Sequence, residues 1–369
     1  MIAKLGDVCT VVSGSTPKST VSEYWDGDIK WITPAELDDD SYIISDSVRH
    51  ITALGVTKTG LKPFPAGTVI LSSRAPIGKT AIAGCEMYCN QGFKNLICSD
   101  KIDSKYLYFF LSSKTDYLNS LGRGATFKEV SKIIVENIEI PLPEIAEQKA
   151  IATCFEKLML LIKMRKAELG ELDKLVKSRF IELFGTIHDN RFGFSVVTLQ
   201  DVSAPIKDGT HQTPIYTTDA ENGYKFLSSK DVTTGKVDWS HLKYIPEELH
   251  RELYARISPR KGDILLAKNG TTGIAAIVDR DEVFDIYVSL ALIRPHGVDS
   301  TYLWAAINAA ETKQQFDASL KGIGVPNLHL GEIKKARIIL PPMELQEQFA
   351  AFVEQTDKSK LCGEMEVAA

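Results

Sequence analysis

The sequence contains little cysteine, and its six cysteines are not spaced as metal ligands. Only Cys85 and Cys89 lie close together, and no second Cys or His pair follows at the distance that a zinc-binding fold requires. We therefore predict reduced thiols and no structural metal.

The 369 residues also lack a long apolar run. No stretch approaches the roughly 18 apolar residues that cross a bilayer, and no apolar signal segment follows Met1–Lys4. With 44% hydrophobic and 25% charged residues, the composition is that of an ordinary globular protein. We expect a cytoplasmic protein with no membrane partner.

An excess of positive charge is missing as well. The formal net charge is -5, and the segments 1–143 and 186–343 each hold nearly equal numbers of acidic and basic residues. The chain as a whole therefore does not attract phosphate. A DNA-binding face would need a local concentration of basic side chains or a basic partner.

Catalytic motifs are absent too. Gly78-Lys79-Thr80 resembles the end of a phosphate-binding loop, but Ser73 stands where the first glycine of that motif belongs. Leu340–Met343 lacks the polar residue of an amino-methyltransferase motif, and no lysine follows the acidic segment Glu36–Asp40 at nuclease spacing. We predict that the chain is not an enzyme and binds no cofactor.

The sequence does contain a long internal repeat. Ile140–Gln148 recurs as Leu340–Gln348, and each copy places Pro, Glu and Gln at the start of a predicted helix. Further matches precede it in the same order: Leu5–Val8 with Leu199–Val202, Lys30–Ile32 with Lys225–Leu227, Gly67–Leu71 with Gly262–Leu266, Asp103–Leu107 with Asp299–Leu303, and Gly122–Gly124 with Gly322–Gly324. Two copies of so long a unit predict two similar globular domains and not a solenoid.

Each copy predicts strands first and helices last, which is an α+β arrangement. In the first copy we expect strands at 8–12, 30–33, 68–71, 80–83 and 94–98 and a helix at 105–118. In the second copy we expect strands at 224–227, 263–266, 275–278 and 288–293 and a helix at 302–319.

Between the copies the pattern becomes that of one long helix. The segment 144–185 has apolar residues at spacings of three and four, which is typical of a helix that pairs with another helix. Pro143 marks its start and Gly185 its end. The partner that we expect is the C-terminal helix from Glu344, whose good pattern covers only about 17 residues. We thus divide the chain into domains at 1–143 and 186–343, a central spacer helix at 144–185, and a short C-terminal spacer helix and tail at 344–369.

These features together resemble the specificity (S) subunit of type I restriction-modification systems. The resemblance rests on the two-fold repeat, the Gly-Asp-Ile-Leu-Leu strand with its glycine loop, and the Ile-Pro-Leu-Pro-x-x-x-Glu-Gln helix start, and it spans nearly the whole chain. It implies two target-recognition domains joined by long antiparallel coiled-coil-like helices. It also implies recognition of a bipartite double-stranded DNA target, docking of methyltransferase (M) subunits on the helices and association with a restriction (R) subunit, with catalysis on partner chains. The second helix is shorter than the usual second spacer of that family.

Most candidate DNA-binding residues lie in loops after the predicted strands and helices, where polar groups can meet base edges or phosphates. These loop candidates are Arg74, Lys79, Arg123, Thr126 and Lys128 in the first copy, and Lys268, Asn269, Thr271, Asn327 and His329 in the second. Further candidates are Asn90, Gln91 and Lys94 in the first copy and Lys207, Thr210 and His211 near the start of the second. Candidate helix-partner residues are Phe155, Leu158, Ile162, Leu169, Leu172, Val176, Leu183, Leu345, Phe349 and Phe352.

Two alternatives stay open at the level of sequence. A scaffold of the same duplicated architecture would hold protein partners without reading DNA sequence, and the acidic net charge is compatible with it. Two chains could also pair through Leu169, Leu172, Val176 and Leu183 if the short C-terminal helix leaves these residues uncovered.

Overall fold

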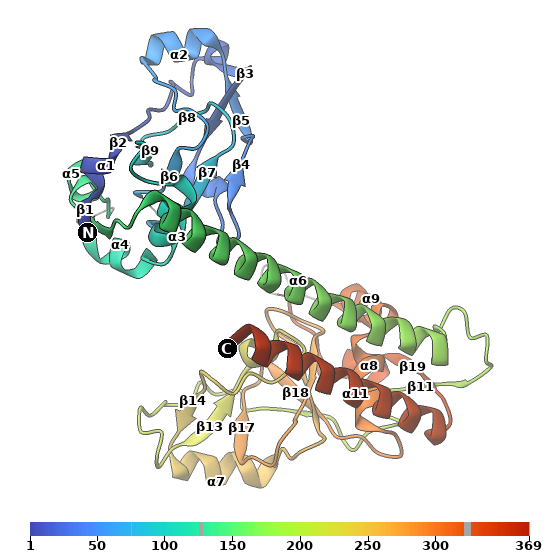
Figure 1. The fold of residues 1–369 in the computed structure, drawn as a ribbon. Helices are drawn as coiled ribbons and strands as arrows, with labels where there is room; N and C mark the ends of the chain where they lie inside the picture. Colours follow the sequence, from blue (N-terminus) through green and yellow to red (C-terminus); the bar gives the residue numbers. More distant parts are fainter. Residues whose placement is uncertain (75, 125–127, 321–325, 369) are drawn as a thin grey trace. The chain divides into compact units, whose positions relative to one another are not determined.

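The computed structural model describes residues 1–74, 76–124, 128–320 and 326–368, the last eight by their backbone alone. The chain forms two compact units, Met1–Lys163 and Met164–Ala369. Their boundary falls inside one helix, α6 (Ile145–Phe184), and each part of this helix packs within its own unit (Figure 1).

The described residues of the first unit form three small sheets. The largest has the strand order β2 (Cys9–Val12), β9 (Asn95–Cys98), β6 (Val69–Leu71), β7 (Thr80–Ala83), β4 (Ile43–Ile44). The second has the order β5 (Arg49–Ile51), β3 (Trp25–Ile32), β8 (Tyr88–Cys89), and the third pairs β1 (Ile2–Lys4) with β10 (Glu139–Pro141). The other elements are α1 (Leu5–Val8), η1 (Ser22–Tyr24), η2 (Pro34–Glu36), α2 (Ala53–Thr59), α3 (Ser104–Ser112), α4 (Thr115–Leu121) and α5 (Lys132–Glu136).

The second unit repeats this plan. One sheet has the order β12 (Lys207–Asp208), β18 (Leu290–Ile293), β15 (Ile264–Ala267), β16 (Ala275–Ile277), and another has the order β14 (Lys243–Ile245), β13 (Tyr224–Leu227), β17 (Phe284–Ile286). A third pairs β11 (Ser195–Thr198) with β19 (Arg337–Leu340). The other elements are η3 (Ser229–Val232), α7 (Glu247–Arg256), α8 (Ser300–Asn308), α9 (Ala310–Ser319), α10 (Leu330–Lys335) and α11 (Met343–Ala368).

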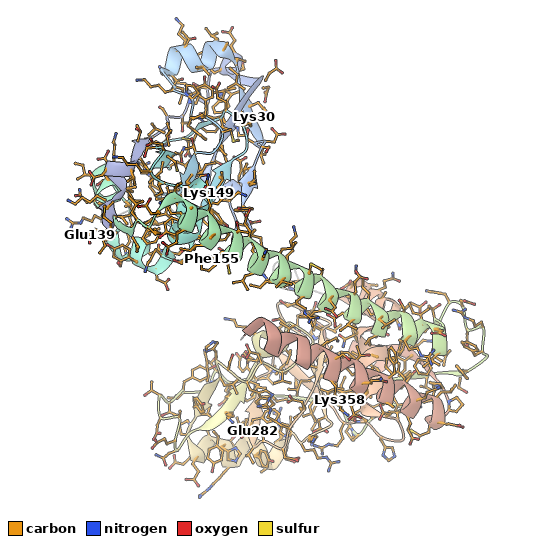
Figure 2. The ribbon with its side chains drawn as sticks, in the orientation of Figure 1. Lys30, Glu139, Lys149, Phe155, Glu282 and Lys358 are labelled. Atoms are coloured by element: carbon orange, nitrogen blue, oxygen red, sulfur yellow. The ribbon has the colours of Figure 1, made fainter. Side chains whose placement is uncertain are left out.

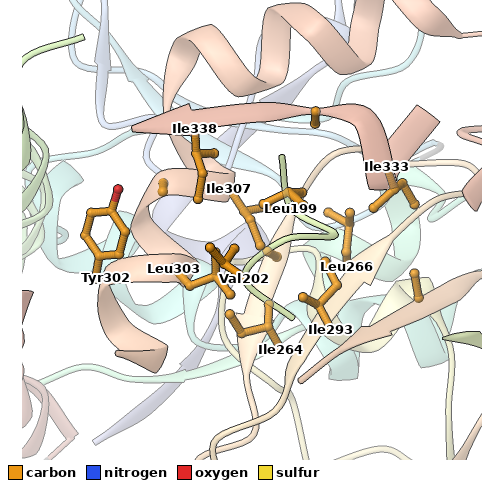
Figure 3. Packing of buried hydrophobic residues seen from close by; sticks show 14 of the residues in the cluster. Leu199, Val202, Ile264, Leu266, Ile293, Tyr302, Leu303, Ile307, Ile333 and Ile338 are labelled. Atoms are coloured by element: carbon orange, nitrogen blue, oxygen red, sulfur yellow. The ribbon is translucent and has the colours of Figure 1, made fainter. Parts of the chain in front are cut away.

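The central strand of each unit is buried on both faces. Successive side chains of a strand point to opposite sides, so neighbouring residues of this strand belong to different hydrophobic clusters. In β15, Ile264 and Leu266 pack with Leu303 of α8 in one cluster, whereas Leu265 belongs to a second cluster. Figure 3 shows the first of these clusters, with Ile293 of β18 beside the β15 residues. In β6, Val69 and Leu71 likewise face one cluster and Ile70 faces another.

Two glycines at equivalent positions show how closely the two units match. A Cβ atom on Gly14 would lie 1.8 Å from the Cys89 carbonyl oxygen, and one on Gly209 would lie 2.0 Å from the Ile286 carbonyl oxygen. Both contacts lie where a parallel strand pair ends, β3 with β8 and β13 with β17. The duplicated α+β fold predicted from the sequence is therefore confirmed, down to the backbone of individual loops.

Each long helix is anchored to its unit by one buried glutamine. The Gln148 side-chain oxygen accepts a hydrogen bond from the Asp103 N–H at 2.9 Å, and its amide donates to the Pro143 carbonyl at 2.9 Å. Gln346 repeats the pattern, accepting from the Asp299 N–H at 2.9 Å and donating to the Pro341 carbonyl at 2.8 Å.

These bonds correct the sequence register at the helix start. The sequence pairs Gln148 with Gln348 and Pro141 with Pro341, whereas the structural counterparts are Gln346 for Gln148 and Pro341 for Pro143. A proline and a glutamine coincide in both registers, whereas the glutamates coincide only in the register that the sequence suggests. Burial selects the register in which Gln346 reaches the end of β19 and the start of α8.

We expect Gln346→Ala to lower the free energy of unfolding of the second unit by about 2 kcal/mol, because a buried backbone N–H and carbonyl lose their partners. Gln348→Ala is the matched control, since Gln348 is exposed, and should change this free energy by less than about 0.5 kcal/mol. Urea unfolding of both variants measures the difference. Equal losses would favour the register that the sequence suggests.

The C-terminal part of α6 pairs with α11. Phe180 and Phe184 of α6 lie 5.5 and 5.6 Å from the ring of Phe349 on α11. Further along, Lys360 of α11 forms a 2.7 Å ion pair with Asp173 of α6, so the two helices run antiparallel.

Helix α11 is longer than the sequence pattern indicates. It continues to Ala368, although the good apolar pattern lasts only about 17 residues, because its first turns are held by packing. Val176 is buried and Leu183 packs in the same cluster as Phe349, Val353 and Phe352. The expectation that Val176 and Leu183 have no packing partner within the chain is therefore wrong. Two chains have no reason to pair through these two residues.

Among the described residues, no helix is both long and apolar enough to span a bilayer.

Candidate nucleic-acid interface

The candidate loops of the two units share one backbone scaffold. In the first unit the Ser73 N–H donates to the Gly92 carbonyl at 2.7 Å, and the Val130 N–H donates to the Ser73 carbonyl at 3.0 Å. Lys268 holds the same position in the second unit. Its N–H donates to the Ser289 carbonyl at 2.9 Å, and the Leu328 N–H donates to the Lys268 carbonyl at 2.8 Å. The loops after β6 and β15 therefore hold three chain segments together at the same place in each unit.

A charged cluster occupies this place in the first unit. The Glu129 carboxylate lies 2.8 Å from Arg74 Nη2 and 3.0 Å from Lys94 Nζ. The Lys94 ammonium is buried and also donates to Ser73 Oγ at 3.3 Å. We call Ser73, Arg74, Lys94 and Glu129 the first cluster. It carries a net positive charge and keeps the partly exposed Arg74 guanidinium beside a fixed carboxylate.

The first cluster should respond to acid. Burial raises the pKa of Glu129, but its hydrogen bonds to Arg74 and Lys94 lower it further, so the pKa lies below its ordinary value. Such a group contributes stability that is complete above its unfolded pKa of about 4.3, and this contribution disappears as the pH falls through the lower folded pKa. We expect the stability of Glu129→Gln to change less between pH 6 and pH 3 than that of the unaltered chain, measured by urea unfolding at each pH.

The exposed Glu139, labelled in Figure 2, supplies the control for this prediction. Glu139→Gln should keep the pH dependence of the unaltered chain. If Glu129→Gln and Glu139→Gln give the same pH profile, the proposed coupling of Glu129 to Arg74 and Lys94 is contradicted.

A different charged cluster occupies the second unit. Lys268 Nζ lies 3.0 Å from Asp208 Oδ2, and both side chains are almost fully buried. His211 Nε2 lies 3.3 Å from the same oxygen. Arg256 Nη2 donates to the Asp208 and Gly209 carbonyls. We call Asp208, His211, Arg256 and Lys268 the second cluster.

Beside the second cluster, Asn269 and Asn327 face each other. They form an antiparallel backbone bridge, as Arg74 and Glu129 do in the first unit. The side-chain oxygens of both asparagines are buried and accept no hydrogen bond within the described part of the chain.

Two of the remaining candidates bond to the backbone of a cluster residue: Arg123 exchanges two 3.0 Å hydrogen bonds with Glu129, and Lys207 bonds to Arg256. In the first unit, Lys79 pairs with Asp39, Asn90 accepts from the Gly92 N–H, and Gln91 accepts from the Thr16 hydroxyl. Arg123 and Lys128 are exposed on either side of residues 125–127, and Thr126 lies outside the described residues.

In the second unit, Lys207 donates to the Arg256 carbonyl at 3.1 Å, and the Thr210 hydroxyl accepts from the Gln212 N–H at 3.3 Å. Thr271 and His329 are exposed. The structure thus brings Arg74 and Lys94 together in one unit, and His211 and Lys268 in the other. Among the other candidates, Lys207 lies in β12.

Sequence reasoning missed Glu129, Asp208 and Arg256. Carboxylates do not donate hydrogen bonds to phosphates, so the criteria for candidate DNA contacts leave out the acidic residues that hold Lys94 and Lys268. Arg256 ends α7, a helix that the strand-rich pattern did not predict. The signal that was available is physical: a lysine next to a fully apolar strand needs a carboxylate partner.

The predicted helix-partner residues fall into two sets. Val176, Leu183, Leu345, Phe349 and Phe352 pack in one cluster of the second unit, and Leu169 and Leu172 are half-buried. Phe155, labelled in Figure 2, stacks on Phe109 of the first unit at 5.2 Å, whereas Leu158 and Ile162 remain 47% and 38% exposed.

Within the described residues, no group of three or more His, Cys, Asp or Glu side chains is placed to hold a metal ion.

A family model described as "Type I restriction modification DNA specificity domain" matches residues 1–174 and 193–362. The MjaIX specificity subunit of a type I restriction enzyme from Methanocaldococcus jannaschii is 31% identical over 96% of this chain and 85% of its own length. The EcoKI specificity subunit from Escherichia coli K12 is 21% identical over 96% of this chain and 81% of its own length.

Two solved structures share the fold. A chain from a type I R-M system studied for complex assembly and conformational transition superposes with a TM-score of 0.60 at 19% identity, covering 100% of this chain and 93% of that one. The type I restriction-modification S subunit from M. genitalium superposes with a TM-score of 0.52 at 14% identity, covering 100% of this chain and 92% of that one.

Proposed function

Because the chain belongs to the family of type I restriction-modification DNA specificity subunits, we propose that it reads a bipartite double-stranded DNA target with its two repeats. In this proposal residues 1–143 and 186–343 each recognise one half of the target, in the cytoplasm. Specificity subunits are recognition components, and catalysis belongs to other subunits.

The observation that carries the proposal is one scaffold with two different sets of side chains. Equivalent loops place Ser73, Arg74 and Glu129 in the first unit and Lys268, Asn269 and Asn327 in the second. A fold that only held two protein partners would have no need to vary hydrogen-bonding groups at the same loop positions. Reading two different half-sites requires this variation, since base edges differ in their donors and acceptors.

The charges of the clusters suit a complex better than the isolated chain. Each cluster concentrates basic groups, but its carboxylate neutralises part of the charge and the chain carries a net charge of -5. Phosphate contacts supply much of the affinity of DNA-binding proteins. We therefore expect weak binding by the chain alone and tight binding once basic partner subunits are present.

The partners that we propose are methyltransferase subunits that dock on the long helices and a restriction subunit that joins the assembly. Leu158 and Ile162 lie one helical turn apart on α6, and both are exposed. Apolar side chains on one stripe of a helix favour burial against another protein surface.

Replacing both apolar side chains with aspartate, Leu158→Asp with Ile162→Asp, should weaken copurification of the methyltransferase subunits at least about tenfold, because two charges would have to be buried at the interface. Lys157→Asp, on the same helix and also exposed, should leave copurification nearly unchanged. Undiminished copurification of the double variant would exclude this surface.

Retardation of DNA duplexes tests the recognition itself. The chain together with its methyltransferase subunits should retard a sequence-specific subset of a duplex pool at moderate salt, and the chain alone should retard little. If the complete complex binds every duplex equally, the chain is an interaction scaffold without its own sequence readout, and the proposal fails.

A further inference from the structure

One pair of positions occurs at the same place in both units but carries different side chains: an arginine and a glutamate in the first unit, and two asparagines in the second. We call it the bridge pair: Arg74 with Glu129 in the first unit, and Asn269 with Asn327 in the second. In each unit the two residues form an antiparallel bridge next to the buried strand, β6 or β15. Their neighbours match too, since Ser73 and Lys268 precede the first member and Val130 and Leu328 follow the second.

In the first unit the bridge pair is an ion pair. Glu129 Oε2 accepts from Arg74 Nη2 at 2.8 Å, while Glu129 Oε1 is taken by the buried Lys94. The carboxylate is thus held from two sides. The Arg74 side chain is 44% exposed, so its guanidinium is oriented by a fixed partner and still reaches the surface.

In the second unit the bridge pair is two amides. Both side-chain oxygens are buried, and neither has a hydrogen-bond partner within the described residues. Buried polar atoms in folded proteins nearly always have a partner, so these two neighbouring oxygens are free to accept a hydrogen bond from a ligand or from water. Both residues are only half-buried, and rotation about the soft terminal torsion of an asparagine side chain can present its oxygen at the surface.

The two kinds of side chain match different bases. The amide of asparagine donates to adenine N7 and accepts from the adenine N6 amino group, whereas the arginine fork donates twice to guanine O6 and N7. A carboxylate that holds the arginine plane favours the second contact, because it removes side-chain freedom before DNA binds.

We propose that the bridge pair decides which base each unit reads. In the second unit, one of Asn269 and Asn327 contacts adenine N6 and N7 at one position of the half-site while the other orients it, and in the first unit Arg74 reads guanine at one position of the other half-site. This inference rests on the proposed function, because it names the residues that carry its specificity. Thr271, Lys128 and the other surrounding candidates then contact phosphates or neighbouring bases.

Selection from a duplex library with both half-sites randomised tests the proposal. The complete complex, with its methyltransferase subunits, is prepared with the unaltered chain, with Asn269→Asp and with Asn327→Asp, and bound duplexes are sequenced. Asn222→Asp is the matched control, because Asn222 is an exposed amide of the same unit whose side chain donates to Asp219 within its own turn. Aspartate keeps the size of asparagine but cannot donate to adenine N7.

The unaltered chain should select adenine at one position of one half-site. Asn269→Asp and Asn327→Asp should each lower that preference at least about tenfold, leaving the other half-site and the Asn222→Asp profile unchanged. Arg74→Lys should in turn weaken a guanine preference in the other half-site only.

Two results would overturn the inference. The first is an unchanged motif in both bridge-pair variants. The second is loss of every position of that half-site in both, because the asparagines would then support the fold of the unit and not one base contact. If the unaltered complex selects no motif, the proposed function itself fails, which distinguishes the two claims.

Discussion

Asp208→Ala should lower the free energy of unfolding of the second unit by about 3–5 kcal/mol, because it leaves the buried Lys268 ammonium without its carboxylate. Lys268 is only 5% exposed and lies 3.0 Å from Asp208. Neither His211 nor Arg256 can replace the lost negative charge. Urea unfolding of the chain, followed by a probe in the second unit, measures the loss.

The double variant Asp208→Ala with Lys268→Met separates the charge from the packing. Methionine fills the volume of the lysine stem without a charge, so we expect the double variant to recover most of the stability that the single variant loses. A loss below about 1 kcal/mol for Asp208→Ala alone would show that Lys268 finds another partner or reaches water, and would contradict the burial of this pair.

Phe349→Ala should cost about 3–5 kcal/mol of the same free energy, because it opens a cavity where α6 and α11 meet. Phe349 is fully buried and contacts the rings of Phe180 and Phe184, and Phe184 in turn contacts Tyr302 of α8. One side chain therefore joins both long helices to the body of the unit.

Phe192→Ala is the control of the same residue type in the same unit. Its ring is 47% exposed, stacks on Phe194 and lies under the Arg191 guanidinium, which is 5.6 Å from the ring centroid. We expect a loss below about 1 kcal/mol. Similar losses for Phe349→Ala and Phe192→Ala would mean that the pairing of α6 with α11 contributes little to the stability of this unit.

The sequence predicts the repeated α+β fold because each copy of a duplicated unit must bury its own version of the central strand. Val69–Leu71 and Ile264–Ala267 are wholly apolar and bounded by turn residues, and both form central strands. The long helix α6 follows from its apolar spacing and its flanking Pro143 and Gly185, and it ends within a residue of the predicted bounds.

Helix breaks could not be predicted from apolar spacing. The expected helix at 302–319 is two helices, α8 and α9, separated at Ala309. The Thr312 hydroxyl donates to the Ala306 carbonyl at 2.7 Å and so satisfies a carbonyl at the end of α8. The expected helix at 105–118 likewise breaks, between α3 and α4, at Ser113 and Lys114. Such endings depend on side-chain hydrogen bonds that the spacing of apolar residues does not reveal.

The sequence predicts which loops hold candidate interface residues, but it does not predict which of these residues contact one another. Arg74 stands out as a basic residue after a strand and Lys94 as one at the start of a strand. Their common partner Glu129 lies 35 residues beyond Lys94 and is brought to them by the fold. Lys94 and Lys268 also hold different places on the common scaffold, since the counterpart of Lys268 is Ser73. An alignment of the two copies by residue type alone therefore cannot identify which positions of the two clusters are equivalent.

The most direct test of the central claim is sequencing of methylated bases in cells that express the chain with its methyltransferase subunits. Two half-sites that differ in sequence and are separated by a gap of fixed length are the predicted result, because two similar units with different loop chemistry read one target. A single contiguous motif, two identical half-sites, or methylation without sequence preference would contradict the account.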